Sequence, residues 1–329
     1  MKIAIITDSW IPLINGVTTT LSNVVDCLED DGHNIFVIHP GMFKNFPCPT
    51  YPEIRLTRNP WSIKKFLNQF NPEAIHIATE GPLGYFGRKW CLKNKKKFTT
   101  SYHTKFPEYL HMRTKWPLSF SYNFLKNFHN QSNGTLITTD SMKHELEEKG
   151  FENLTIWTRG VDQNLFNPNK RTKKSVIPTY LYVGRISVEK NIETFLNIET
   201  FGKKVVVGDG PQLKELKQKY KTVEFVGAKQ GIELAEYYAN ADVFVFPSKS
   251  DTFGVVMIEA LASGLPIAAY PVTGPIDIVK NGYNGILSDD LKYALDFCLY
   301  VSKNDCRESV KDYTWKKCAE IFFNHLVPN

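Results

Sequence analysis

Short apolar runs alternate with amphipathic stretches along most of the chain. The runs predict strands, and the stretches between them repeat their apolar positions with the period of a helix. In the first half the predicted strands are 3–7, 34–39, 74–77, 98–102, 134–138 and 154–157. The predicted helices there are 18–29, 83–92, 119–130 and 141–149. Strands with few polar interruptions, separated by helices, indicate a parallel sheet that is covered on both faces.

A polar, basic stretch at 167–178 interrupts this alternation. It has neither a strand period nor a helix period, and it therefore predicts a linker between two domains. Strands are predicted again at 180–183, 204–207, 223–226 and 243–246. Helices are predicted after 190, after 211, and at 232–238, 255–263 and 315–326. Two successive units of this kind predict an α/β fold class, with two Rossmann-like, doubly wound domains that face each other across a cleft.

Composition and charge narrow the class of protein. The chain has 329 residues, which exceeds the size at which a single hydrophobic core stops growing. Its net charge of +6 is typical of a mildly basic cytosolic surface and also suits a phosphate-bearing substrate or an anionic membrane surface, but it does not indicate nucleic acid. No apolar run approaches the ~20 residues that span a bilayer. The 6 cysteines form no CxxC pair, so we expect a cytoplasmic protein with reduced thiols.

The segment 246–269, FPSKSDTFGVVMIEALASGLPIAA, places two carboxylates around the start of a predicted helix. Gly254 opens that helix, and the backbone N–H groups at 253–256 form a site for phosphate. Asp251 and Glu259 lie eight residues apart, and carboxylates accept hydrogen bonds from the paired hydroxyls of sugars and ribose. These acids either hold a sugar and a ribose or are solvated surface groups, and this segment alone leaves both interpretations open.

The segment 181–191, LYVGRISVEKN, places two cations just beyond a predicted strand. Gly184 allows the backbone to turn, and Arg185 and Lys190 follow, five residues apart. Cations at the carboxyl end of a strand can neutralise a leaving diphosphate, with Arg as a planar fork and Lys as a point charge. The alternative is a solvated loop with incidental charges.

Weaker signals follow other predicted strands. The GDGP run places Gly208 and Gly210 in a tight turn that either is only a turn or also borders a nucleobase, and Gly227 could contact the same base. Gly16 precedes a predicted helix and allows close approach of a pyrophosphate, although the dinucleotide and Walker patterns are absent. His103 follows a strand end, which suits either a structural or a sugar-binding role. The chain has no Asp-x-Asp triplet, so we predict no metal site.

Together these motifs resemble the retaining glycosyltransferases of family 4, which have the GT-B fold. The resemblance covers nearly the whole chain in order: the Gly16 loop, His103, TRGVD at 158–162, Arg185, Lys190, GDGP and the Asp251–Glu259 block. The usual pattern of the family has two glutamates eight residues apart. Here the first is Asp251, whose shorter side chain is expected to shift the contacts with the sugar.

The resemblance implies an acceptor domain at 1–168, a donor domain at 169–311 and a helix at 312–329 that returns toward the first domain. The implied catalytic residues are His103, Arg185, Lys190 and Asp251. The residues implied to bind the donor nucleotide-sugar are Gly16, Gly184, Gly208, Gly210, Gly227, Phe253, Gly254, Val255 and Glu259. Arg185 and Lys190 would neutralise the diphosphate, and Glu259 would bind the ribose. Asp251 would hold the sugar, and His103 would stabilise its oxocarbenium-like state.

The motifs HTKFPEY, WTRGVD and SDTFGVVMIEALASGLP look most like those of GDP-mannose-dependent α-mannosyltransferases and sulfoquinovosyl-lipid synthases of this family. The implied function is transfer of a hexose, first of all mannose from GDP-mannose, to a lipid or glycan acceptor without a metal or other cofactor. The alternatives are a glycosyltransferase that uses a UDP-sugar, a phosphorylase or epimerase with the same cleft, and a non-catalytic scaffold that binds nucleotide-sugars.

Basic and aromatic residues are mixed at 105–129, and KNKKK lies at 93–97. Such a mixture either contacts an anionic membrane and reaches a lipid acceptor, or is a solvated charge run beside ordinary core aromatics. The expected partners are a nucleotide-sugar donor, a lipid or glycan acceptor and the inner face of an anionic membrane, with no nucleic acid.

Overall fold

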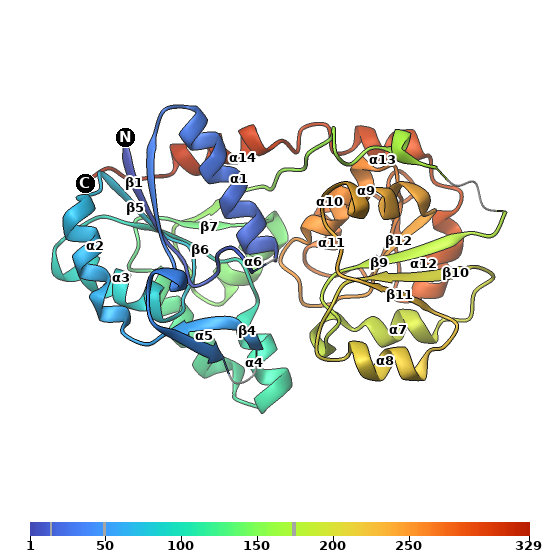
Figure 1. Cartoon of the computed structure of the whole chain (residues 1–329), viewed down its shortest axis with the longest axis horizontal. Coiled ribbons are helices and arrows are strands. Elements are labelled where there is room, and N and C mark those ends of the chain that lie inside the picture. Colours follow the sequence, from blue (N-terminus) through green and yellow to red (C-terminus); the bar gives the residue numbers. More distant parts are fainter. Residues whose placement is uncertain (14, 49–50, 173–175) are drawn as a thin grey trace. The chain divides into compact units, whose positions relative to one another are not determined.

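The chain forms two compact units in a computed structural model that describes residues 1–13, 15–48, 51–172 and 176–329 (Figure 1). The first unit comprises Met1–Arg159 and Trp315–Asn329, and the second comprises Gly160–Thr314. Within the described residues, no helix is both long and apolar enough to cross a membrane.

The first unit is built on a parallel sheet with the strand order β2-β1-β5-β6-β7-β8. Its strands are β1 (Lys2–Ile6), β2 (Asn34–Ile38), β5 (Ala74–Ile77), β6 (Thr99–Ser101), β7 (Thr135–Ile137) and β8 (Leu154–Ile156). Its helices are α1 (Gly16–Asp30), α2 (Ile63–Phe70), α3 (Pro82–Lys93), α4 (Phe106–Thr114), α5 (Leu118–His129), α6 (Asp140–Glu148) and α14 (Trp315–Asn324). An antiparallel hairpin of β3 (Asn45–Cys48) and β4 (Tyr51–Thr57) stands apart from the sheet.

The side chains of β1 alternate between two apolar layers. Ile3 and Ile5 pack with residues of α1 and α14, whereas Ala4 and Ile6 pack with residues of α2 and α3. Successive side chains of a strand point to opposite faces of the sheet, so a strand covered on both faces is apolar throughout. This double burial explains the continuous apolar run at the start of the sequence.

The last helix completes the core of the first unit. In Figure 1, α14 lies beside α1, and its residue Phe322 is fully buried against Trp157, with ring centroids 5.3 Å apart. The indole Nε1 of Trp157 donates a hydrogen bond of 3.0 Å to the carbonyl of Cys318. The final residues of the chain are therefore part of the same core as its first strand.

The second unit repeats the architecture with the parallel strand order β11-β10-β9-β12-β13-β14. Its strands are β9 (Thr179–Val183), β10 (Lys203–Val207), β11 (Glu224–Gly227), β12 (Val243–Phe246), β13 (Ile267–Ala269) and β14 (Gly285–Leu287). Its helices are α7 (Ile192–Asn197), α8 (Leu213–Lys219), α9 (Gly231–Asn240), α10 (Val255–Ala262), α11 (Pro275–Ile278), α12 (Leu291–Cys298) and α13 (Lys303–Glu308). Figure 1 shows α7 and α8 on one face of this sheet and α9 and α10 on the other. Leu181 and Val183 of β9 face α9 and α10, while Tyr180 and Tyr182 face α7 and α8.

The units divide at Arg159/Gly160 and at Thr314/Trp315, whereas the sequence indicates 168/169 and 311/312. The segment after Gly160 packs on the second unit, because Val161 N–H bonds to the Tyr313 carbonyl at 3.0 Å. The described residues of the stretch predicted as the linker, 167–172 and 176–178, also belong to the second unit. There Arg171 donates to Asp242 at 2.9 Å, while residues 173–175 lie outside the described part.

Each strand and helix predicted from periodicity is present, with ends within two residues of the predicted ones. The elements not predicted are β3, β4, β13, β14, α2, α4, α11, α12 and α13. Strands β13 and β14 have three residues each, like the predicted strands β6, β7 and β8, so their length alone does not explain the difference. Each strand of the hairpin contains a proline, a residue that argues against a strand in a sequence.

Candidate functional site

The strand order of the second unit reverses between β9 and β12, which pair directly although two strands separate them in sequence. From this point the chain winds toward β10 in one direction and toward β13 in the other. In open parallel sheets, ligands bind beyond the carboxyl ends of the strands at such a switch point. The loops that follow β9 and β12 are therefore where we looked for chemistry, and they carry Arg185, Lys190 and Asp251.

Hydrogen bonds fasten these two loops to each other. Asn191 Nδ2 donates to the carbonyl of Pro247 at 3.0 Å, and Ser250 Oγ donates to the carbonyl of Glu189 at 3.2 Å. As a result, Lys190 Nζ and Asp251 Oδ1, 61 residues apart in sequence, form an ion pair. The structure thus brings together two of the predicted catalytic residues.

Asp251 keeps one carboxylate oxygen available. Its Oδ2 is buried and has no hydrogen-bond partner within the described residues, although Oδ1 is engaged by Lys190. A buried carboxylate oxygen is costly unless it accepts a hydrogen bond. This oxygen is therefore suited to accept a hydrogen bond from a hydroxyl of a bound sugar.

A second cation lies in the loop after β9. Arg185 Nε lies 3.8 Å from Oε1 of the buried Glu189. The carbonyl of Arg185 accepts a hydrogen bond of 2.7 Å from Tyr182 Oη. These contacts hold the base of the loop while about a quarter of the Arg185 side chain remains exposed. A partly exposed guanidinium held in place is well suited to bind a phosphate oxygen.

The start of α10 offers backbone donors beside this loop. Gly254, at φ 86°, turns the chain into the helix, and a Cβ there would lie 2.9 Å from the ring of Phe246. No side chain caps the helix, so the first N–H groups, at Val255 and Val256, remain available for an anion. Phe253 is buried, and its ring centroid lies 6.1 Å from that of Tyr313.

Glu259 lies one turn into α10 and is half-buried. Burial raises the pKa of its carboxyl to about 7, although the 2.8 Å hydrogen bond from Tyr238 Oη to its Oε2 acts in the opposite direction. The carboxyl can therefore change its charge near neutral pH and take further hydrogen bonds at the oxygen that Tyr238 leaves unoccupied.

Four glycines, at 184, 208, 210 and 227, bring the ends of neighbouring strands into contact. Gly184 N–H bonds to the Val207 carbonyl at 3.0 Å, and Gly208 N–H bonds to the Gly227 carbonyl at 2.9 Å. A Cβ on Gly208 would lie 1.9 Å from the carbonyl oxygen of Gly184, and one on Gly210 would lie 2.3 Å from that of Ile186. The close packing of these loops alone therefore requires glycine at 208 and 210, whatever ligand the loops bind.

In the first unit, Gly16 is the first residue of α1 rather than the residue before it. Asn15 caps this helix, because its Oδ1 accepts a hydrogen bond of 2.9 Å from Thr18 N–H. Asp8, in the same loop, is buried and accepts from Thr79 Oγ1, Leu83 N–H and Gly84 N–H at 2.9 to 3.2 Å. Asp8 therefore ties the loop after β1 to the start of α3.

His103 follows β6 and lies half-buried in a polar network. Its Nε2 lies 2.8 Å from Ser101 Oγ, and its Nδ1 lies 3.1 Å from a guanidinium nitrogen of Arg159. The ring meets Trp157 edge-on, with centroids 5.5 Å apart. Burial, together with the positive charge of Arg159, holds the pKa of His103 well below its usual range. Its imidazole is thus neutral at physiological pH.

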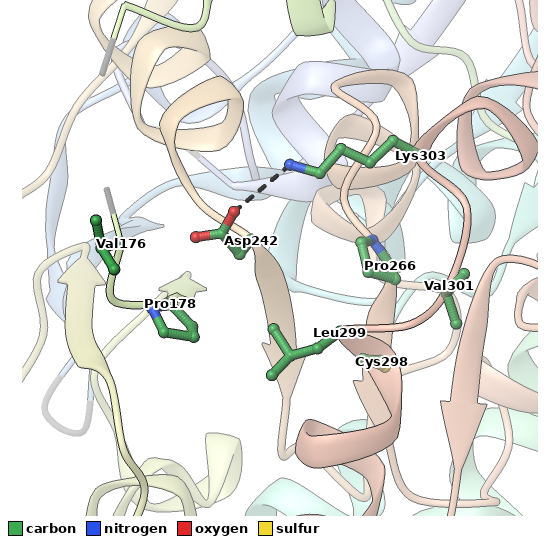
Figure 2. A pocket seen from close by; sticks show the side chains of 8 residues that line it. All are labelled: Val176, Pro178, Asp242, Pro266, Cys298, Leu299, Val301 and Lys303. Atoms are coloured by element: carbon green, nitrogen blue, oxygen red, sulfur yellow. Dashed lines mark ion pairs between the residues drawn. The ribbon is translucent and has the colours of Figure 1, made fainter. Parts of the chain in front are cut away.

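A separate pocket of about 170 Å³ lies at the opposite edge of the second sheet (Figure 2). It is lined by Val176, Pro178, Asp242, Pro266, Cys298, Leu299, Val301 and Lys303. Asp242 and Pro266 precede β12 and β13, so the pocket borders the amino ends of the strands. Asp242 is already bonded to Arg171 at 2.9 Å, to Thr179 N–H at 3.0 Å and to Lys303 at 3.5 Å. This pocket therefore belongs to a structural ion cluster and not to the loops described above.

The described part of the chain holds no cluster of three or more His, Cys, Asp or Glu side chains placed to bind a metal ion. The charged groups at the switch point are instead the ion pair of Lys190 with Asp251, the guanidinium of Arg185 and the carboxyl of Glu259.

Residues 14–165 match the family described as Glycosyltransferase Family 4, and residues 177–298 match that described as Glycosyl transferases group 1. A GDP-mannose-dependent alpha-mannosyltransferase of Corynebacterium glutamicum is 30% identical, over 99% of this chain and 89% of that protein. The chain belongs to glycosyltransferase family 4. It is accordingly a retaining hexosyltransferase that takes its sugar from a nucleotide-sugar.

Two further comparisons agree with this assignment. The sulfoquinovosyl transferase SQD2 of Arabidopsis thaliana is 28% identical over 83% of this glycosyltransferase and 60% of that protein. Sucrose-phosphate synthase from Thermosynechococcus elongatus has the same fold, with a TM-score of 0.81 at 21% identity over 98% of this chain and 97% of that one. The predicted fold class and family are therefore confirmed.

Three buried polar residues of this glycosyltransferase, in the two units, were not predicted as site residues. Asp8, Arg159 and Tyr238 are buried polar groups whose partners come from distant elements. Asp8 follows the first strand directly, so its place at a strand end was a usable signal. Tyr238 offered none, because it lies within the apolar pattern of α9.

The raised pKa of Glu259 gives a test of its contact with ribose. We expect the affinity for a nucleoside diphosphate to rise as pH increases from 5 to 7 and to level off above 7, because the ionised carboxylate is the better acceptor. Glu259→Gln should lower the affinity by about 1–3 kcal/mol and remove this part of the pH dependence. Isothermal titration across this pH range measures both effects.

Glu193→Gln is the matched control, since Glu193 lies in an ion pair with Lys219 on helices α7 and α8 of the same unit. The phosphate groups of the nucleotide ionise in the same way with the unmodified protein and with both variants. Only the difference between the curves of affinity against pH therefore reports on the Glu259 carboxyl. An unchanged curve in Glu259→Gln would exclude the ribose contact.

Proposed function

We propose that this glycosyltransferase transfers mannose from GDP-mannose to a lipid or glycan acceptor, with retention of configuration and without a metal ion. The choice of donor is supported by the 30% identity, over nearly the whole chain, to a GDP-mannose-dependent alpha-mannosyltransferase. The observation that carries the sugar-transfer chemistry is the pairing of Lys190 with Asp251 at the switch point, with one Asp251 oxygen that accepts no hydrogen bond from the described residues.

The second unit supplies the groups that such a donor needs. In the proposal, Lys190, Arg185 and the first N–H groups of α10 bind the diphosphate and neutralise its charge as it leaves. Asp251 Oδ2 accepts a hydrogen bond from a hydroxyl of the sugar, and the carboxylate of Glu259 accepts hydrogen bonds from the ribose hydroxyls. Gly184, Gly208, Gly210 and Gly227 contribute backbone contacts to the nucleotide. For the first unit, Gly16 contacts the donor and His103 borders the sugar.

The proposed reaction is a front-face displacement. The oxygen of the acceptor hydroxyl bonds to the anomeric carbon on the face from which the diphosphate departs. The bond between that carbon and the phosphate oxygen breaks, and its electron pair leaves with the phosphate. The proton of the acceptor hydroxyl passes to the departing phosphate oxygen. Groups that stabilise the charge only as it develops, such as Lys190 and Arg185, dominate catalysis of this kind.

The acceptor is proposed to be presented at an anionic membrane surface. The segment from α4 to α5 exposes the large apolar side chains Phe106, Met112, Trp116, Leu118, Phe120 and Phe124, of which Phe120 is 66% exposed. Lys115 lies in the turn between these helices and is exposed as well. Apolar side chains beside cations are typical of surfaces that bind the interface of an anionic bilayer.

Thermal unfolding with GDP, UDP and ADP compounds, in the presence of EDTA, tests the donor. We expect GDP and GDP-mannose to raise the melting temperature, because a ligand at 100 times its Kd adds about 2.7 kcal/mol. A shift with UDP compounds alone would assign a UDP-hexose as the donor in place of GDP-mannose. The absence of any shift would contradict the proposed donor site, and nucleotide binding that requires Mn²⁺ would contradict the metal-free mechanism.

Lys190→Ala should lower the transfer rate by about 10²- to 10³-fold, because it removes a cation that stabilises the leaving diphosphate. Initial rates at saturating donor measure this effect. Lys219→Ala is the control, since Lys219 is also ion-paired with an acid of the second unit but lies on α8. Near-normal turnover of a folded Lys190→Ala variant would remove Lys190 from the proposed mechanism.

Sedimentation with liposomes tests the membrane surface. The protein should bind vesicles that contain an anionic phospholipid, and the double substitution Trp116→Ala with Phe120→Ala should weaken binding at least tenfold by removing exposed apolar area. Phe201→Ala is the control, because Phe201 is 82% exposed in the second unit. Failure of the unmodified protein to bind anionic vesicles at low salt would exclude the membrane contact.

A further inference from the structure

Arg159 is a buried cation with an unusual set of partners. Arg159 is only 3% exposed, and no carboxylate of the described residues lies within ion-pair distance of its guanidinium. One terminal nitrogen donates to the carbonyls of Trp157 at 2.7 Å and Thr158 at 3.2 Å. The other terminal nitrogen lies 3.1 Å from Nδ1 of His103. Buried charges normally have an opposite charge as partner, so the contact with a histidine requires an explanation.

The guanidinium determines where the imidazole carries its proton. Arginine has only donors, so Nδ1 of His103 must accept and cannot carry a hydrogen. In a neutral ring the proton then resides on Nε2, which can donate to Ser101 Oγ at 2.8 Å. The Ser101 hydroxyl can in turn donate to Nε2 of His76 at 3.1 Å, and Nδ1 of His76 can donate to Thr99 Oγ1 at 2.9 Å. The whole chain of hydrogen bonds thus runs in one direction from Arg159.

The groups around the imidazole all oppose its protonation. Arg159 faces it from the segment after β8, His76 from β5 and His129 from α5. His129 is itself bonded to Glu80 at 3.0 Å, and burial lowers the pKa of His76 to about 3. Cys318 of α14 faces Arg159 from the other side, and burial lowers the pKa of this guanidinium to about 10, so that it stays charged at neutral pH.

The position of Arg159 is fixed by the last helix. Its guanidinium lies 4.6 Å from the ring of Trp157, whose indole donates to the carbonyl of Cys318. The Cys318 thiol in turn contacts the carbonyl of Thr158 at 3.2 Å. Contacts with α14 therefore hold Trp157 and Thr158, the two residues that precede Arg159. They thereby fix the point from which the Arg159 side chain extends.

We propose that Arg159 is a positioning residue that holds His103 in its neutral form with the proton on Nε2. In the transfer reaction, positive charge develops on the sugar, and a protonated imidazole beside it would oppose that charge. A neutral, rigidly held ring adds no such penalty. This consequence rests on the proposed function, in which His103 borders the sugar, whereas the tautomer itself is a property of the protein alone.

The tautomer can be measured directly. Long-range ¹H–¹⁵N spectra of protein labelled at histidine distinguish a protonated from an unprotonated ring nitrogen, and His103→Gln assigns the signals. In the unmodified protein we expect Nδ1 of His103 to be unprotonated and the ring to stay neutral well below pH 6.5. A doubly protonated ring at pH 7, or a proton on Nδ1, would overturn the proposal without any variant being needed.

Arg159→Met tests the role of the guanidinium. We expect the titration midpoint of His103 to move up toward its ordinary value of about 6.5, and kcat/KM to fall about 10- to 100-fold with a new acid limb. Arg159→Lys keeps a charged donor and should retain the tautomer in part. Arg88→Met is the matched control: Arg88 also donates to two backbone carbonyls and lies over an aromatic ring, but it bonds to no histidine of the described residues.

The two measurements separate the inference from the proposed function. A changed titration of His103 with unchanged transfer kinetics would confirm the positioning by Arg159 and remove His103 from the reaction. An unchanged tautomer and titration in a folded Arg159→Met variant would overturn the inference, whatever the transfer rate. An equal effect of Arg88→Met on the His103 signals would show general loosening of the unit and would also overturn it.

Discussion

The ladder of hydrogen bonds between parallel strands is the constraint on which the candidate site of the second unit depends. Strand β9 lies between β10 and β12. The sheet therefore extends from β9 toward β10 and β11 on one side and toward β12 and β13 on the other. The loops after β9 and β12 consequently end at the same edge of the sheet, where Asn191 and Ser250 fasten them together. Without the pairing of β9 with β12, Lys190 and Asp251 would not be held close together. The close approach of Gly208 to the carbonyl of Gly184 extends the same edge to β10. The site is therefore a product of strand order first and of side-chain chemistry second.

Buried polar groups play the corresponding part in the first unit. Asp8 is bonded to the start of α3, and Arg159 begins a line of hydrogen bonds that reaches β5 and β6. Burial of such groups is costly unless each finds a partner, so the arrangement tolerates few alternatives. The high pKa of Asp8, about 6, reflects that cost, and the hydrogen bonds from Leu83 and Gly84 offset part of it.

Charge at the two candidate regions is handled in different ways. In the second unit, cations and carboxyls neutralise one another in pairs, as Lys190 does with Asp251 and Arg185 with Glu189. A charged ligand that binds here would have to replace partners of these ions, whose side chains are between 3% and 27% exposed. In the first unit, the guanidinium of Arg159 lies beside His103, and burial holds the pKa values of His103 and His76 below their usual range. The first arrangement suits the binding of a diphosphate, and the second holds a neutral imidazole in a fixed orientation.

The sequence by itself determined the fold class, the family and most of the elements, because doubly buried strands are apolar throughout and helices repeat their apolar positions. It also located Arg185, Lys190, Asp251 and Glu259, since each lies at a strand end or in the first turns of a helix. It left open whether these acids and cations were solvated surface groups, because that depends on partners far away along the chain. Only the tertiary structure decided that Lys190 pairs with Asp251, that Glu259 is bonded to Tyr238 and that Gly16 begins its helix. It alone also showed that the contacts of Val161 and Arg171 place the predicted linker within the second unit and that Arg159 lies against His103. Periodicity reports on which face of an element is buried, whereas these contacts depend on which elements the folded chain brings together.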